Sequence, residues 1–266
     1  MRTALTIAGS DPTGGAGVQA DLKTFAAFAV YGVSAVTAVT AQSTTGIASV
    51  EALSADLVTA QIEALAGDVI IHATKVGMLA NAAIVEAVAA AVEELELPLV
   101  VVDPVLASAS GTRLLDDEGV QMLCRELIPK CAVVTPNIPE AEVLSGKRIA
   151  SIDDAREAAS RIREMGAGSV IVTGGHGTGE ESVDLFYDGR AFVELRTARV
   201  TAARVHGTGC AFAAALAAGL AYGFQTVEAA RLAQAYVAGG MRRALAIGHG
   251  AAVLDHFWQA PARPPR

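Results

Sequence analysis

The chain has 266 residues, of which 52% are hydrophobic and 18% are charged, a composition that supports a sizeable core and argues against disorder. Its formal net charge of −8 excludes a general basic surface for nucleic acid. An anionic ligand would therefore have to be bound locally, by backbone amides and a few cations.

Apolar runs alternate with helical patterns along the whole chain. The first half predicts a strand at 3–8, a glycine-rich loop at 9–17, a helix at 18–29, a strand at 33–40, a polar loop at 41–46, a helix at 54–66, a strand at 73–77, a helix through 84–95 and a strand at 99–102. The second half predicts a helix at 117–127, a strand at 133–134, a helix at 151–165, a strand at 169–173, a hairpin of 184–187 with 192–195, a helix after residue 210 and a last helix at 226–247.

Strands that alternate with helices and are apolar on both faces are typical of an α/β fold with a mostly parallel sheet between two helical layers. We expect one domain at residues 1–258 and a frayed tail at 259–266. Ligands of such sheets bind beyond the carboxyl ends of the strands. The following polar or small residues fall at those ends: Asp11, Gln42, Lys75, Asp103, Asn137, Gly174 and Cys210.

The cysteines and the apolar runs bear on location. Cys124, Cys131 and Cys210 form no C-x-x-C pair and no zinc-ligand cluster, which is typical of reduced thiols in a cytosol. The first apolar run, residues 4–8, is too short for a signal peptide, and no run is long enough to span a membrane. We expect a cytoplasmic protein without a membrane partner.

The stretch His206-Gly207-Thr208-Gly209-Cys210 precedes a long run of small residues with helical spacing. Glycines let the backbone turn sharply, and the following helix aims unpaired N–H groups and its positive dipole end at one point. An oxyanion or a phosphoryl group would bind there without a lysine. The alternative is a plain glycine-rich turn before a buried helix.

Two known phosphate motifs fit poorly. Gly9 and Gly14 have the spacing of a P-loop, but Gly15-Ala16 replaces its lysine and hydroxyl residue. The segment 15–20 matches G-x-G-x-x-A of dinucleotide-binding folds, yet it starts late after the first strand, and the second strand ends without an acid. A dehydrogenase is therefore the alternative that these residues favour less.

Asn137 and Glu140 place an amide and a carboxylate three residues apart at the start of a helix. Oxygen ligands of this kind suit Mg²⁺, which phosphoryl transfer requires. The same pair is also the pattern of a helix capping box, and that simpler interpretation is favoured for these two residues alone.

Several stretches occur together in one order: 8–23, Lys75-Val76-Gly77-Met78-Leu79, Val102-Asp103-Pro104-Val105, Thr135-Pro136-Asn137-Ile138-Pro139-Glu140, Gly174-Gly175-His176 and residues 206–210. As a set they resemble the hydroxymethylpyrimidine/phosphomethylpyrimidine kinases of thiamine biosynthesis, in the ribokinase superfamily. The resemblance implies a ribokinase-like three-layer α/β/α fold, ATP and Mg²⁺ as cofactors, and a homodimer. It implies phosphorylation of 4-amino-5-hydroxymethyl-2-methylpyrimidine and then of its monophosphate.

By matching position, the resemblance implies a pyrimidine pocket lined by Gly9, Asp21, Gln42 and Met78. It assigns phosphates and nucleotide to Asn137, Glu140, Thr173, Gly175 and His176, and the metal region to Asp103 and Glu140, directly or through water. It assigns catalysis to Gly207, Thr208, Gly209 and Cys210. Simpler roles are a solvated carboxylate for Asp21, a loop amide for Gln42 and a core side chain for Met78.

Cys210 stands where sugar kinases of the superfamily have an aspartate base. A helix N-terminus lowers a thiol pKa below its usual value of about 8.5. We therefore expect a thiolate that removes the acceptor's hydroxyl proton; the alternative is a small buried side chain that fills the turn.

The chain also departs from the family pattern. Thr173 and Ala109 replace lysines that the family usually has, and Arg204-Val205 replaces an Asn-Thr pair. These changes leave two alternatives open: a pyridoxal kinase with the same fold, or a catalytically weak pyrimidine-binding regulatory protein. Gln42 favours the pyrimidine over pyridoxal because an amide suits the aminopyrimidine edge.

Overall fold

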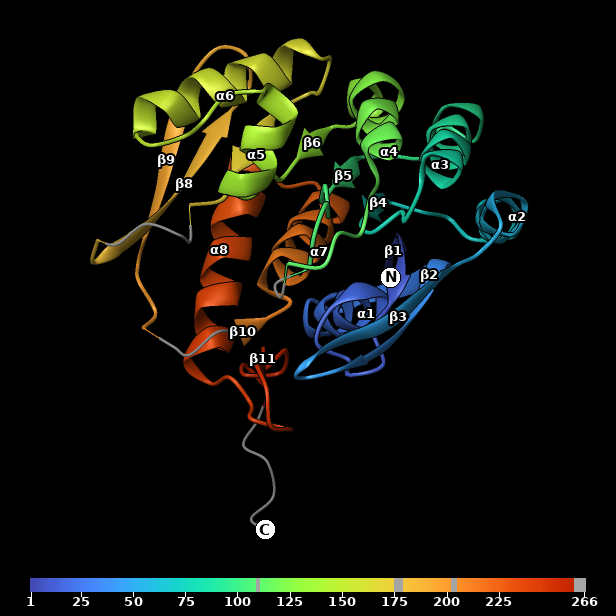
Figure 1. Ribbon diagram of the computed structural model, residues 1–266, viewed down its shortest axis with the longest axis horizontal. Helices are drawn as coiled ribbons and strands as arrows, with labels where there is room; N and C mark the ends of the chain where they lie inside the picture. The colour runs from blue at the N-terminus through green and yellow to red at the C-terminus, as the bar shows by residue number, and fades with distance from the viewer. Residues whose placement is uncertain (109–110, 175–178, 202–204, 261–266) are drawn as a thin grey trace.

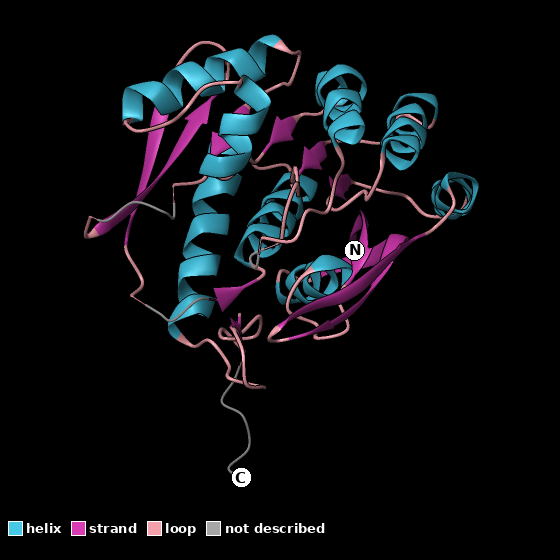
Figure 2. Ribbon diagram, in the orientation of Figure 1, coloured by secondary structure: helices cyan, strands magenta, loops and turns pink. Residues whose placement is uncertain are grey.

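The computed structural model describes residues 1–108, 111–174, 179–201 and 205–260. A large central sheet lies between two layers of helices (Figure 1), and Figure 2 shows that the strands form the middle layer. The strands are β1 (Arg2–Ser10), β2 (Val30–Ser43), β3 (Gly46–Ala52), β4 (Ala73–Val76), β5 (Val100–Val102), β6 (Val133–Val134), β7 (Val170–Val172), β8 (Glu181–Tyr187), β9 (Phe192–Ala198), β10 (Val205–His206) and β11 (Ala252–Val253). The helices are α1 (Gly17–Ala27), α2 (Ala55–Ala66), α3 (Ala82–Glu94), α4 (Asp117–Met122), the π-helical η1 (Leu123–Leu127), the 3₁₀ turn η2 (Ile128–Lys130), α5 (Ile138–Ser145), α6 (Ile152–Glu164), α7 (Thr208–Ala221) and α8 (Thr226–Arg242).

The nine-stranded sheet has the order β3-β2-β1-β4-β5-β6-β7-β8-β9. The strands from β2 to β7 in this order are parallel, whereas β3, β8 and β9 pair antiparallel at the two edges. Ile7 of β1 pairs with Val76, Val76 with Val102, and Val102 with Val134, so the carboxyl ends of four neighbouring strands lie level. The expected mostly parallel α/β sheet is confirmed.

Alternating strand residues enter two separate cores. Val101 and Val133 pack with α7 and α8 on one face, while Val100 and Val102 pack with α2, α3 and α6 on the other. Strands buried on both faces are hydrophobic throughout, which is why they could be recognised as short apolar runs. Within the part of the chain that is described, no helix is long and apolar enough to cross a lipid bilayer.

The predicted loop at 41–46 is wrong. β2 continues to Ser43, and residues 46–52 return as β3, which pairs with β2 in an antiparallel hairpin. Most β3 side chains are exposed, so backbone pairing at the sheet edge holds this strand and no apolar pattern marks it. The last helix also ends earlier than expected, at Arg242 instead of residue 247.

Residues 248–253 return to the N-terminal half of the chain. The Ala251 N–H donates to the Thr44 carbonyl at 2.9 Å, and the Gly250 N–H donates to the Thr44 hydroxyl at 3.1 Å. A Cβ on Gly250 would lie 1.9 Å from the Thr44 oxygen, so a side chain is excluded there. β11 then pairs with β10, so this segment joins the tip of the β2–β3 hairpin to the turn before α7. Most of the tail expected at 259–266 lies outside the described residues.

His256 follows this segment and is buried, with 4% of its surface exposed. Its Nδ1 lies 3.1 Å from the Thr24 hydroxyl, while its Nε2 has no hydrogen-bond partner among the described residues. Burial and then the nearby charge of Lys23 lower the pKa of His256 to about 4. The folded protein therefore holds this imidazole neutral.

Acidification is expected to destabilise the fold through His256. Between pH 6.5 and about 4 the unfolded chain binds a proton here that the folded chain does not. The free energy of unfolding then falls by up to about 1.4 kcal/mol per pH unit as the pH decreases, and the effect ends below the folded pKa. Urea unfolding at pH 7, 6 and 5 measures this slope. His256→Gln should have a flatter profile than the wild type; equal slopes in the two proteins would contradict the assignment.

Candidate active site

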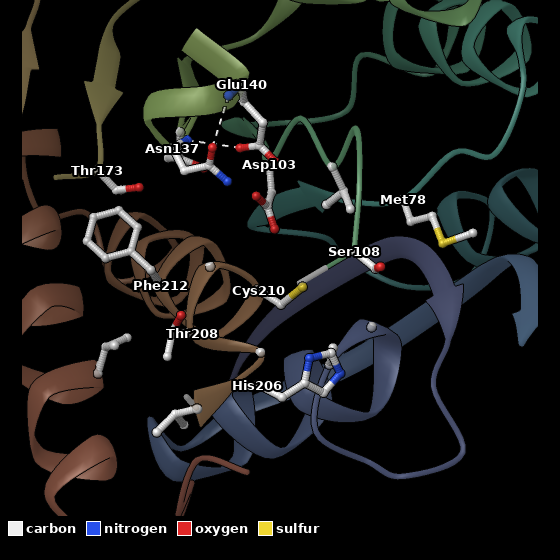
Figure 3. A pocket seen from close by; sticks show the side chains of 18 of the residues that line it. Met78, Asp103, Ser108, Asn137, Glu140, Thr173, His206, Thr208, Cys210 and Phe212 are labelled. Atoms are coloured by element: carbon white, nitrogen blue, oxygen red, sulfur yellow. Dashed lines mark hydrogen bonds between the residues drawn. The ribbon is translucent and has the colours of Figure 1, made fainter. Parts of the chain in front are cut away.

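A cavity of about 880 Å³ opens beyond the carboxyl ends of the parallel strands. Each of β1, β2, β4, β5, β6 and β7 ends at this cavity, which is also lined by the first turn of α7. In the view of Figure 3, Asp103, Asn137 and Glu140 appear on one side of Cys210 and His206 on the other. The structure therefore brings residues from distant parts of the sequence to one site, as the strand-end pattern predicts.

The turn before α7 has the geometry expected of an anion-binding site. Gly207 is the N-cap with φ of 82°, α7 starts at Thr208, and no side chain of the described residues caps this end. A Cβ on Gly209 would lie 3.9 Å from Asp103 Oδ1, so the turn lies next to the acid at the end of β5. The first N–H groups of a helix have no partner within the helix and therefore remain available to a ligand here.

Two glycines allow this turn to pack against the loop after β1. A Cβ on Gly207 would lie 1.7 Å from the carbonyl oxygen of Gly15, and a Cβ on Gly15 would lie 2.9 Å from the His206 ring. Neither position has room for a side chain. The loop after β1 and the turn before α7 consequently form one tightly packed wall of the cavity.

A buried ion pair lies at the cavity floor, where Lys75 lines the cavity and Asp21 does not. Lys75 Nζ is 3.0 Å from Asp21 Oδ2 and 3.8 Å from Asp103 Oδ2, and Lys75 and Asp21 have no exposed surface. Burial alone would lower the pKa of Lys75, but the charges around it raise this pKa above its ordinary value. Burial raises the pKa of Asp103 despite the nearby lysine.

The prediction that Asp21 lines the pocket is wrong. Its carboxylate accepts hydrogen bonds from Lys75 at 3.0 Å and from the Thr6 hydroxyl at 2.6 Å, and the residue lies behind the cavity wall. The simpler alternative of a solvated carboxylate is also wrong. Asp21 is the buried counter-charge of Lys75, for which the sequence suggested no role.

The expected low pKa of Cys210 is also wrong. Burial, together with the carboxylates of Asp103 and Asp21, raises its pKa to about 12, against the opposing effects of Lys75 and of a hydrogen bond from the Gly17 N–H. The thiol is therefore protonated, and it donates a hydrogen bond to Asp103. Desolvation and nearby negative charge outweigh the helix N-terminus at this position.

Asn137 and Glu140 form a complete capping box at the start of α5. The Asn137 side chain accepts from the Glu140 N–H at 3.0 Å, and the Glu140 carboxylate accepts from the Asn137 N–H at 2.9 Å. Glu140 is nevertheless nearly buried and lines the cavity. Burial and then the charge of Asp103 raise the pKa of Glu140 to about 8. The helix-capping role expected for these two residues is confirmed, and it places the Glu140 carboxyl group at the cavity wall.

On the β1 and β2 side, Gly9, Gln42 and Met78 all line the cavity. A Cβ on Gly9 would lie 3.1 Å from the Met78 sulfur, so the glycine makes room for that side chain. Thr173 lines the cavity at the end of β7. Gly175 and His176, together with Ala109 and Arg204, lie outside the described residues.

Two polar contacts at this site were not anticipated from the sequence. His206 Nε2 lies 3.1 Å from Asp11 Oδ2, and both residues line the cavity. Asp184 of β8 accepts from the Gly174 N–H and from the Gln234 side chain, each at 2.8 Å. The sequence does signal that Asp184 and Gln234 are unusual, because one is an acid in an apolar strand and the other a glutamine in an alanine-rich helix. It does not indicate that they contact each other.

Comparison with known proteins supports the family resemblance found in the sequence. The family model described as phosphomethylpyrimidine kinase matches residues 11–255. The hydroxymethylpyrimidine/phosphomethylpyrimidine kinase of Rhizobium meliloti is 45% identical over 258 residues, which cover 96% of this chain and 96% of the relative.

Solved structures agree with the sequence comparison. The phosphomethylpyrimidine kinase of Clostridium difficile is 38% identical with a TM-score of 0.79, covering 89% of this chain and 98% of its own. The pyridoxal kinase of Staphylococcus aureus in complex with AMP-PCP and pyridoxal is 36% identical with a TM-score of 0.88. The match covers 97% of this chain and 94% of the kinase chain. With a mostly parallel sheet between helical layers and a match along almost its whole length, the chain belongs to the phosphomethylpyrimidine kinase family, and it has the ribokinase-like fold of these kinases.

Proposed function

We propose that the protein transfers the γ-phosphoryl group of ATP to 4-amino-5-hydroxymethyl-2-methylpyrimidine and then phosphorylates the monophosphate to the diphosphate. The observation that carries this proposal is the uncapped turn Gly207–Cys210 beside Asp103, which opens into the same cavity as Gln42. The turn would bind the oxygens of the moving phosphoryl group, and the side of the cavity formed by the ends of β1 and β2 would bind the acceptor.

The proposed binding site for the acceptor substrate is formed by Gln42, Met78 and Gly9. The Gln42 amide can pair with the ring nitrogen and exocyclic amine of the pyrimidine, because it carries a donor and an acceptor side by side. Met78 supplies a polarizable side chain to pack on the ring. Asp21 is left out of this set because it is buried behind the wall.

Asp103 and Glu140 fit a magnesium ion. Asp103 Oδ2 is buried without a hydrogen-bond partner among the described residues, and the two carboxylates repel each other. In that same part of the chain, no group of three His, Cys, Asp or Glu side chains can hold a metal alone. Mg²⁺ commonly combines one or two carboxylates with water and substrate phosphates, and it would neutralise phosphate charge here. Asn137 and Thr173 would contact the nucleotide.

The protonated Cys210 changes the proposed route of the proton. A free thiolate is not present, but the thiol already donates to Asp103. We propose that the pair acts together: Cys210 Sγ takes the hydroxyl proton of the acceptor as its own proton passes to the Asp103 carboxylate. The alcohol oxygen then forms the bond to phosphorus as the bond to ADP breaks.

Pyridoxal is the second candidate substrate. It is favoured by the Staphylococcus aureus pyridoxal kinase, whose structure in complex with AMP-PCP and pyridoxal superposes on this chain with a TM-score of 0.88. Gln42 on the cavity wall favours the aminopyrimidine instead, because pyridoxal has no exocyclic amine to pair with the amide.

Turnover with each alcohol tests the proposed function. The purified chain is incubated with ATP, Mg²⁺ and either the pyrimidine alcohol or pyridoxal, and ADP and the phosphorylated products are measured. We expect a higher kcat/KM with the pyrimidine and its conversion to the diphosphate. A higher kcat/KM with pyridoxal would assign the second candidate, and the absence of ADP with both would favour a weak regulatory protein.

Cys210→Ala should slow the first transfer more than the second. The first acceptor is an alcohol that must lose a proton, whereas the second is already a phosphate anion. We expect kcat of the first step to fall by at least about 10²-fold, a usual contribution of general-base catalysis, and the second by much less. Cys124→Ala, which removes a thiol that does not line the cavity, is the control. Equal losses in both steps would refute the proton role.

Glu140→Gln separates the metal role from the helix cap. Glutamine keeps the capping box but removes the charge. We expect the Mg²⁺ concentration for half-maximal activity to rise by about tenfold or more, with no loss in the free energy of unfolding. An unchanged Mg²⁺ dependence would leave Glu140 as a helix cap alone.

A further inference from the structure

One nitrogen of His206 faces two partners on the cavity wall. Nε2 lies 3.1 Å from Asp11 Oδ2 and 3.1 Å from the terminal nitrogen of the Gln42 amide. The other end of that amide, its oxygen, is 3.2 Å from the Thr40 hydroxyl. A ring nitrogen either carries a proton or has a lone pair, so it cannot satisfy a carboxylate and an amide N–H together.

Asp11 determines which of the two states holds. Its Oδ2 also accepts from the Ala16 N–H and the Thr13 hydroxyl, each at 2.9 Å. Burial alone would raise the pKa of Asp11, but the hydrogen bonds that it accepts lower it. An ionised carboxylate is an acceptor only, so the facing His206 Nε2 must carry a proton. This holds for the neutral ring and for the imidazolium alike.

A protonated Nε2 then determines the direction of the Gln42 amide. The two ends of an amide have the same shape, and hydrogen-bond partners decide which end is oxygen. With nitrogen toward His206, two N–H groups would face each other. Turning the amide about its axis places Oε1 at His206 and the NH₂ group at Thr40. The Thr40 proton is already directed to the Ser10 carbonyl at 3.0 Å, which leaves a lone pair to accept from that NH₂.

We propose that Asp11, acting through His206, holds the Gln42 amide with its oxygen toward His206 and its nitrogen toward Thr40, and thereby selects an aminopyrimidine over pyridoxal. This inference rests on the proposed function, in which Gln42 contacts the acceptor. An aminopyrimidine edge presents a donor and an acceptor in one order, so it pairs with the amide in one direction only. A freely turning amide would first have to be oriented by the substrate, and the preference for the aminopyrimidine would be weaker. His206 is a positioning residue in this arrangement.

The packing around His206 supports a fixed ring. A Cβ on Gly15 would lie 2.9 Å from the ring, and one on Gly207 would lie 1.7 Å from the Gly15 carbonyl. β10, which contains His206, is paired with β11 through His206 and Val253. Gly15 therefore approaches the ring closely, strand pairing fixes the backbone of His206, and the same residue precedes the anion-binding turn.

NMR of the 266-residue chain with ¹⁵N-labelled histidine shows directly which ring nitrogen of His206 carries a proton. Two-bond ¹H–¹⁵N correlations distinguish a proton on Nε2 from one on Nδ1, and His206→Phe identifies the signals by their loss. We expect Nε2 of His206 to carry a proton, and Asp11→Asn to allow a fraction of the Nδ1-protonated form. A wild-type His206 with a bare Nε2 would overturn the inference, whatever the enzyme's substrate is.

Kinetics test the consequence. In His206→Phe we expect the ratio of kcat/KM for the pyrimidine alcohol over that for pyridoxal to fall by about tenfold, the equivalent of one hydrogen bond. KM for ATP should not change, and His206→Gln, which keeps an N–H donor near the same point, should recover part of the ratio. An unchanged ratio in His206→Phe, with a wild type that does phosphorylate the pyrimidine, refutes this inference alone. A wild type that does not phosphorylate the pyrimidine refutes the proposed function. The NMR result still shows whether His206 Nε2 carries a proton.

Discussion

The positive charge of Lys75 beneath the sheet's carboxyl edge is the interaction on which the site depends. It lies between Asp21 and Asp103 and has no contact with solvent. Two carboxylates buried this closely are not stable without a cation, and loss of one partner of a buried pair costs about 3–5 kcal/mol. A Cβ on Gly77 would lie 2.6 Å from the ammonium group, so the backbone leaves room for it. Cys210 then donates to the acid that Lys75 holds in place.

Much of the fold follows from hydrophobic pattern. The strands around Val101 and Val133 were predictable because burial on both faces makes them apolar throughout. The edge strand β3 was not, since its exposed side chains carry no periodic signal. The two-residue strands β10 and β11 are too short for any pattern, and their pairing depends on a contact between distant parts of the chain.

The sequence predicted where the site lies better than it predicted the environments of the residues within it. Strand-end polar residues such as Gln42 and Asp103 do meet at one cavity, because parallel strands end at the same edge. The environments of Asp21 and Cys210 were not predictable, because burial and charge come from residues far away in sequence. Glu140 shows that a helix cap can also line the cavity: the capping box itself holds the carboxylate at the wall.

The segment that binds Thr44 has a consequence for how the molecule is made. Gly250 and Thr44 are 206 positions apart, yet their hydrogen bond ties this segment to the tip of the hairpin that contains Gln42. Pairings of such high contact order form slowly, and during synthesis Gly250 emerges 206 residues after Thr44. A nascent chain can therefore pair β1 with β2 well before the tip of the hairpin gains these contacts.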